Sequence, residues 1–253
     1  MSKPEKVNDL LIYTRKEKVI DMPYYGFYFD PTYILVLIGV VLCMIASAKV
    51  KTTYNKYEKV ASRSGYTADQ VAYMILRNAG ITNVSINHIS GDLTDNYNPK
   101  NHTLNLSDNV YGSRSIAAIG VAAHECGHAI QHAQGYAPLT IRSAIIPAAN
   151  IGSAISWPLI LIGLIIPRVD FCITLGIILF SLVVVLQFVT LPVEFNASRR
   201  ALGILEGSGY LYEDEMKGAR SVLTAAAMTY VAAMVSASLQ LLRLVMLFGN
   251  RRR

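Results

Sequence analysis

Four long apolar runs without a charged side chain constrain this chain more than any other feature. They occupy residues 32–48, 144–167, 171–193 and 221–242. A helix needs about 20 apolar residues to cross the hydrocarbon core of a bilayer. Four uncharged runs of this length are not typical of core helices in a soluble domain. The sequence therefore predicts a mainly α integral membrane protein with about four transmembrane helices, the last covering residues 221–248.

The composition and the placement of charge agree with a membrane protein. Hydrophobic residues make up 53% of the chain and charged residues only 16%, which is too apolar for an ordinary soluble domain. The formal net charge is +6, and basic residues flank the apolar runs. We therefore expect the lipid bilayer to be a partner and nucleic acid not to be one, because no nucleic-acid motif accompanies the basic residues.

The short gap between the second and third runs fixes the expected topology. Only residues 168–170 separate them, so the two helices form a hairpin. Residues 49–143 and 194–220 must then lie on the same side of the membrane. The basic residues of these two segments favour the cytoplasm, whereas basic residues within 1–31 and the final arginines oppose that choice. The expected localisation is the cell membrane, multi-pass, with the cytoplasm on this side.

The first run also permits a second interpretation. It ends in Ala46-Ser47-Ala48, which resembles a signal-peptidase site. The preceding residues 1–31, an N-terminal extension, contain Asp21 and Asp30 and have no compact basic stretch beside the run. These features favour an uncleaved anchor.

Residues 49–143 change period along their length. A helical pattern up to about residue 80 gives way to alternating polar and apolar positions within 82–107, interrupted by a turn-like stretch at 96–101. This pattern predicts a short β-hairpin between about 82–88 and 103–106. The hairpin could cover the helices, or its edge could pair with an extended peptide.

The next helix contains the sequence His124-Glu125-Cys126-Gly127-His128, an H-E-x-x-H motif. Helical residues four apart project from one face, so His124 and His128 can bind one metal ion, usually zinc. Glu125 lies beside them, where it can take a proton from water. An apolar helix rarely contains such groups without partners. The motif therefore predicts two metal ligands and the catalytic residue Glu125.

A third ligand must come from elsewhere, because a catalytic zinc usually has three protein ligands. Glu194 directly follows the third apolar run, where a carboxylate is costly without a partner. A salt bridge to Arg199 or Arg200 is the alternative role. We expect Glu194 to be the third metal ligand. His132 lies about 12 Å along the helix from His124, too far to share one ion with it.

Two stretches, HECGHAIQH and PVEFNASRRAL, and the two apolar runs between them resemble the bacterial YugP-like family of membrane neutral zinc metallopeptidases. The resemblance covers roughly residues 22–248. It implies one Zn²⁺ held by His124, His128 and Glu194, with Glu125 as the catalytic base.

The layout is also similar to the wider gluzincin group, which includes the heat-shock protease HtpX and the CAAX prenyl protease. That resemblance implies a small α+β zincin-like catalytic segment. Those proteases show an E-x-x-x-D pattern at the third ligand, but this chain has Ser198 at the Asp position. Support of the metal site is then left to hydrogen bonds from Asn196 or Ser198.

The expected function is membrane-embedded zinc-dependent endopeptidase activity on protein or peptide substrates at the membrane. The sequence leaves the oligomeric state open, and four side chains remain candidates to stabilise the oxyanion: Tyr210, Tyr230, Arg199 and Arg200. One alternative is a non-catalytic metal-binding scaffold or adaptor, but closed structural zinc sites usually have four ligands rich in Cys. Another is a small transporter, for which no inverted repeat is visible.

Overall fold

Four helices of the computed structural model, which describes residues 30–249, are long and apolar enough to cross a membrane. This finding confirms the predicted fold class of a mainly α membrane protein. Each of the four continues beyond its apolar run, and their bounds are α1 Tyr33–Glu58, α4 Ala137–Ile165, α5 Phe171–Ser208 and α6 Glu213–Phe248. The expected N-terminal extension, except for residues 30 and 31, and the final arginines lie outside the described residues.

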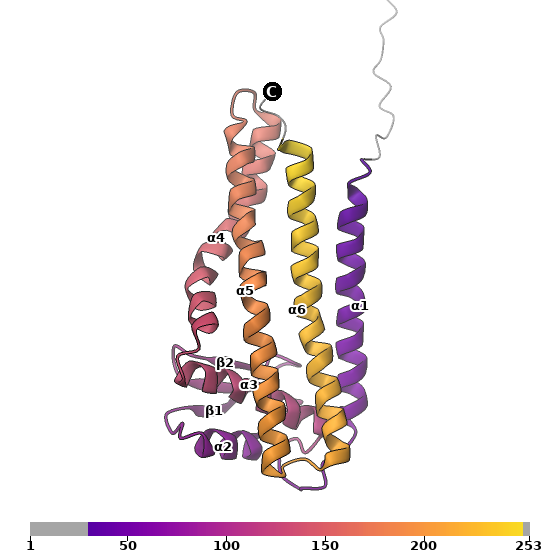
Figure 1. Cartoon of the computed structure of the whole chain (residues 1–253), viewed down its shortest axis with the longest axis vertical. Helices are drawn as coiled ribbons and strands as arrows, with labels where there is room; N and C mark the ends of the chain where they lie inside the picture. Colours follow the sequence, from indigo (N-terminus) through magenta and orange to yellow (C-terminus); the bar gives the residue numbers. More distant parts are fainter. Residues whose placement is uncertain (1–29, 250–253) are drawn as a thin grey trace, which may run out of the picture. The chain divides into compact units, whose positions relative to one another are not determined.

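The four long helices pack in a fixed order of neighbours. Helix α1 packs against α6, α6 against α5, and α5 against α4 (Figure 1). Large apolar side chains on these helices, such as Leu37, Ile151 and Phe188, are more than half exposed. A patch of this kind is unfavourable in water and suits contact with lipid chains. Between helices the contacts use small residues, since a Cβ on Gly152 would lie 2.8 Å from the Leu179 carbonyl oxygen.

The segment between α1 and α4 contains the remaining elements, which are α2 Ala68–Asn78, β1 Ser85–His88, β2 Asn96–Asn98, β3 Thr103–Leu106 and α3 Ile116–Ala133. Figure 1 shows α3 crossing α5 near the end of the bundle opposite the α4–α5 turn. Side chains from α2, β3, α3, α5 and α6 form one buried apolar core, which includes Ile75, Leu104, Ile119 and Leu205. This core fixes α3 against the long helices.

Gly127 allows α3 to approach α5 closely. A Cβ at this position would lie 2.6 Å from the Ala197 carbonyl oxygen, closer than real side chains come to backbone. The glycine sits within the H-E-x-x-H motif, and Ala197 lies less than one turn after Glu194. The close approach therefore brings the two predicted halves of the metal site together.

The small sheet has three strands in the order β1-β3-β2. A short hairpin ending in residues 103–106 is present, as predicted. Its first strand, however, is not the stretch 82–88 that the sequence predicted. Strand β3 pairs antiparallel with β2, which lies in the stretch that the sequence predicted as a turn. Strand β1, the expected partner, instead pairs parallel with β3. The turn is confined to the residues between β2 and β3, and β2 forms the edge of the sheet that faces α3.

Candidate metal centre

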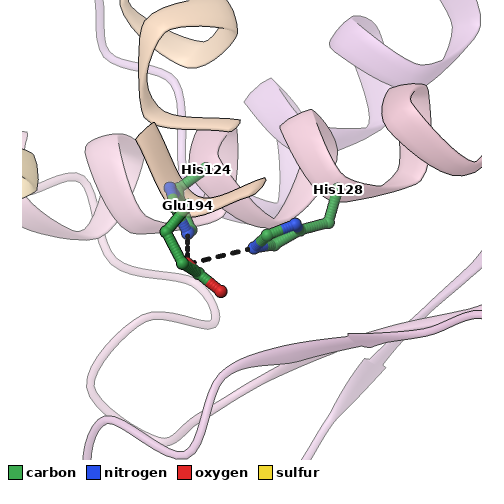
Figure 2. A group of neighbouring side chains, drawn as sticks. All are labelled: His124, His128 and Glu194. Atoms are coloured by element: carbon green, nitrogen blue, oxygen red, sulfur yellow. Dashed lines mark ion pairs between the residues drawn. The ribbon is translucent and has the colours of Figure 1, made fainter. Parts of the chain in front are cut away.

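Helix α3 and helix α5 together position the three predicted metal ligands. Ser115 caps α3 by accepting a hydrogen bond from the Ala118 N–H, and the helix then places His124 and His128 one turn apart on one face. Glu194 projects from α5 toward both rings (Figure 2). Its Oε2 lies 3.3 Å from His124 Nε2 and 3.5 Å from His128 Nε2. The structure therefore brings these three residues together.

The geometry fits one zinc ion. The three candidate ligand atoms all lie within 4.8 Å of one another. Tetrahedral zinc with ordinary bond lengths to nitrogen and oxygen places neighbouring ligand atoms about 3.4 Å apart. Glu194 Oε2 is buried and makes no hydrogen bond, although both imidazoles face it. A buried carboxylate oxygen without a partner is costly, and a cation between these groups would satisfy it.

The electrostatics of His128 lead to the same conclusion. Burial lowers the pKa of His128, but its contacts with Glu194 and the nearby charge of Glu125 outweigh that effect and raise the pKa overall. The site therefore favours a positive charge at this imidazole. A proton or a metal ion can supply that charge.

The second ring nitrogen of each histidine also has a partner. His124 Nδ1 lies 3.1 Å from Ser198 Oγ, and His128 Nδ1 lies 3.0 Å from Gln131 Oε1. If Nε2 binds a metal, Nδ1 carries the proton and donates to these oxygens, which fixes the orientation of each ring. Ser198, at the position where the similar E-x-x-x-D pattern would have an aspartate, thus contacts His124 directly.

Gln131 contacts the candidate metal centre, and the sequence interpretation did not single it out. It is fully buried, and its Nε2 donates to the Val193 carbonyl at 2.8 Å and to Asn196 Oδ1 at 2.9 Å. The same amide therefore contacts both His128 and the turn of α5 that contains Glu194. Its signal in the sequence was its place one turn after His128, on the same helix face.

Replacing Gln131 with methionine is expected to weaken zinc binding by about 10-fold to 100-fold, because His128 loses its hydrogen-bond acceptor. Competition with a chromophoric chelator measures this affinity. The matched control is Gln134→Met, since Gln134 lies on the exposed side and binds Arg200. An equal loss of affinity in both variants would contradict the assigned role of Gln131.

The catalytic candidate Glu125 is almost buried and is held by the edge strand. Its Oε2 accepts a hydrogen bond from the Tyr97 backbone N–H at 2.8 Å. His132, excluded as a ligand on distance, lies outside the ligand cluster, and its Nδ1 is 2.8 Å from the Tyr97 hydroxyl. Strand β2 is thus attached to α3 at two points, one of them the glutamate of the motif.

Two cavities meet at the metal centre, and both are lined by Glu125 and Glu194. One, of about 210 Å³, is mostly apolar and extends between α1, α3 and α6, where Val50, Val121 and Ala226 line it. The other, of about 260 Å³, extends between β2 and the start of α4 and is lined by residues that include Pro99, Leu139 and Arg142. An extended peptide that lies across the metal centre could thus place one side chain in each of the two cavities.

Arg142 is a second residue that the sequence interpretation did not place at the site. Its Nη1 lies 3.1 Å from Glu194 Oε1, the carboxylate oxygen that does not face the histidines. The alternative salt bridge of Glu194 to Arg199 or Arg200 is absent from the ion pairs of residues 30–249. Arg200 instead contacts Asn196 and Gln134.

Among the four candidates for oxyanion stabilisation, only Tyr230 lines the cavities at the centre, and it lines both. Tyr210 is buried in the core, where its hydroxyl accepts a hydrogen bond from Asn78 and its ring contacts Tyr66. Arg199 and Arg200 line neither cavity. Of the four, the structure thus places only Tyr230 at the candidate centre.

The structure combines four helices that can span a membrane with a cluster of two histidines and a glutamate. A second glutamate lies beside this cluster. These are the features of a membrane metallopeptidase. The chain belongs to the family described as "Putative neutral zinc metallopeptidase", whose model matches residues 32–249. It is also 45% identical over 207 residues to the "Putative membrane protease YugP" of Bacillus subtilis (strain 168), a match that covers 82% of this chain and 92% of that protein.

These comparisons confirm the resemblance inferred from the sequence and indicate a protease role for this membrane protein. The family also implies zinc as the metal. No solved structure matches the chain.

Proposed function

We propose that this protein is a membrane-embedded zinc-dependent endopeptidase that cleaves membrane or membrane-proximal proteins. In this proposal His124, His128 and Glu194 hold one Zn²⁺, and Glu125 is the catalytic base. The observation that best supports it is the buried Glu194 Oε2, which faces both imidazoles without a hydrogen bond, next to the motif glutamate. Zinc at these ligands would polarise the scissile carbonyl and make a water molecule more acidic.

Glu125 performs the proton transfers in this proposal. It accepts a proton from the attacking water and delivers it to the leaving amine. The Tyr97 N–H holds Oε2 of this carboxylate at 2.8 Å, so we assign the transfers to the other oxygen. A fixed carboxylate loses little orientational freedom in the reaction, which favours a fast chemical step.

Strand β2 is the proposed platform for the substrate. The Tyr97 N–H points toward Glu125 and not toward β3, so the edge of β2 that is unpaired with β3 faces the metal centre, with this N–H bound to Glu125. We propose that an extended peptide pairs with the main-chain groups of this edge beside the Tyr97 N–H, and main-chain pairing tolerates many sequences. The apolar cavity between α1 and α6 then favours an apolar side chain on one side of the scissile bond.

Tyr230 and Arg142 receive different roles. The Tyr230 hydroxyl is the proposed donor to the oxyanion, because Tyr230 lines both cavities at the centre. Arg142 contacts Glu194 at 3.1 Å and is a positioning residue, which holds that carboxylate with Oε2 toward the histidines.

The depth of the site supports substrates at the membrane surface. Glu194 lies about 35 Å along α5 from Phe171, at the helical rise per residue. The hydrocarbon core of a bilayer is about 30 Å thick, so the centre sits where α5 leaves it on the side opposite the α4–α5 turn. The basic residues of this side favour its placement at the cytoplasmic face.

Sequencing of new protein N-termini in membranes tests this proposal. Cells that produce the parent protein should contain cleavage products whose cut sites cluster at the cytoplasmic ends of membrane spans. Cells that produce the Glu125→Gln variant at equal level should lack them. Cut sites on the opposite side would contradict the orientation, and identical profiles in both cells would favour the alternative of a non-catalytic scaffold.

A further inference from the structure

A third hollow, separate from the two cavities at the metal centre, lies between α1 and α6. It has a volume of about 620 Å³ and shares no lining residue with either of those two cavities. Lys49 and Lys56 of α1 and Lys217 and Arg220 of α6 line it. The two lysines of α1 are seven residues apart, and the two basic residues of α6 are three apart. Each helix therefore presents one basic face to the same hollow.

The positive charge of this hollow is not neutralised within residues 30–249. None of the four basic side chains takes part in an ion pair among these residues. The acidic residues Asp214 and Glu215 in the first turn of α6 pair with Arg63 instead. Four cations that converge on one concave surface repel one another and favour an anionic ligand.

The hollow also has groups that can hydrogen-bond to an anion. Thr53 and Thr224, whose side chains contain hydroxyl groups, line it beside the basic side chains. Helix α6 approaches α1 closely here, since a Cβ on Gly218 would lie 2.8 Å from the Tyr57 ring. The hollow is therefore a cleft bounded by two packed helices, which distinguishes it from a flat basic surface.

Toward the membrane the same faces become apolar. On α1 the residues that continue the basic face are Ile45 and Leu42, both exposed, and on α6 the hollow ends at the exposed Met228. A ligand with a charged head and apolar chains could thus place its head among the cations and its chains along these side chains. Free phosphate would use only the basic part.

We propose that this cleft binds the headgroup of an anionic phospholipid from the surrounding bilayer. The basic groups and hydroxyls contact the phosphate, and the acyl chains lie along Leu42, Ile45 and Met228. Basic pockets between membrane helices suit such headgroups, and a bound lipid would stabilise the contact of α1 with α6. The inference depends on insertion of the helices in a membrane and not on the proposed peptidase activity.

Native mass spectrometry of the purified full chain in detergent tests the site with dioleoyl phosphatidylglycerol as the probe. The parent should retain this lipid and bind dioleoyl phosphatidylcholine much more weakly. The double variant Lys49→Gln/Lys217→Gln should bind phosphatidylglycerol about 30-fold more weakly, because two charge-assisted contacts are lost. The thermal midpoint of the parent should rise with phosphatidylglycerol and not with inorganic phosphate.

The matched control is Lys51→Gln/Lys59→Gln, which removes the same charge from exposed positions of the same region that do not line the cleft. It should bind phosphatidylglycerol within about twofold of the parent. A second pair, Lys56→Gln/Arg220→Gln, should repeat the loss, and unchanged thermal midpoints without lipid would show that both pairs fold. Equal losses in the control, equal binding of phosphatidylcholine, or equal stabilisation by inorganic phosphate would each overturn the proposal.

Discussion

Replacing Glu125 with glutamine is expected to lower kcat/KM for cleavage of a substrate by about 10³-fold to 10⁴-fold, the upper range for loss of a general base. The amide has nearly the shape of the carboxylate, and its oxygen can still accept the hydrogen bond from the Tyr97 N–H. It cannot take a proton from water. The fold and the three proposed ligands should therefore remain, and only the proton transfer should be lost.

The measurement compares purified parent and variant on one substrate that the parent cleaves, with the zinc content of both determined by elemental analysis. Equal zinc content shows that the loss belongs to the chemical step. The control Glu206→Gln makes the same change at an exposed position of α5 and should leave kcat/KM within about twofold, as for most surface substitutions. Substantial activity in the Glu125 variant would mean that another group is the base.

The membrane architecture could be predicted from the sequence because each span leaves a direct signal. An uncharged run of about 20 residues has few alternatives to a membrane helix. The ends of the helices leave a weaker signal. Helix α5 continues through Pro192 as far as Ser208, although its apolar run ends at residue 193. Packing against α3 stabilises this polar extension, and such tertiary contacts are not visible in a local pattern.

The edge strand illustrates the same limit. Asn96 and Asn98 belong to a residue type that is common in turns, and Pro99 follows them, so the local pattern indicated a turn. The structure pairs Asn96 with Asn105 and Asn98 with Thr103, and the Asn105 side chain donates to Asn96 Oδ1 at 3.0 Å. Strand formation here depends on a partner strand and on the contact of Tyr97 with Glu125, and neither can be read from residues 96–98 alone.

The residues of the candidate metal centre also differ in whether the sequence alone reveals them. His124, Glu125 and His128 are spaced by helix geometry, and that spacing is visible in the sequence. Arg142 has no such spacing, and the place of Gln131 one turn after His128 does not reveal its contact with α5. In the sequence, Arg142 counts only among the basic residues that favour the cytoplasm on its side of the membrane. Residues that support a ligand thus depend on the packing of helices distant in the sequence.

Replacing Glu194 with alanine should weaken zinc binding by at least about 100-fold, more than the loss of an outer hydrogen bond, because a direct ligand is removed. The binding of zinc to the folded state also stabilises it. At zinc 100 times above its dissociation constant, the parent should gain about 2.7 kcal/mol, and a variant that binds 100-fold more weakly should gain only about 0.4 kcal/mol. Thermal unfolding with and without zinc measures this difference, and peptide cleavage should disappear in parallel.

The variant Arg142→Gln separates a metal ligand from a buried ion pair. If Glu194 acts mainly as the partner of Arg142, both substitutions break the same contact at 3.1 Å and should reduce the zinc effect equally. If Glu194 is a ligand, Arg142→Gln should keep most of the zinc-dependent stabilisation, since Oε2 still faces His124 and His128. Full zinc-dependent stabilisation in Glu194→Ala would exclude this carboxylate from the metal site. That result would leave its buried oxygen between two imidazoles without a physical reason.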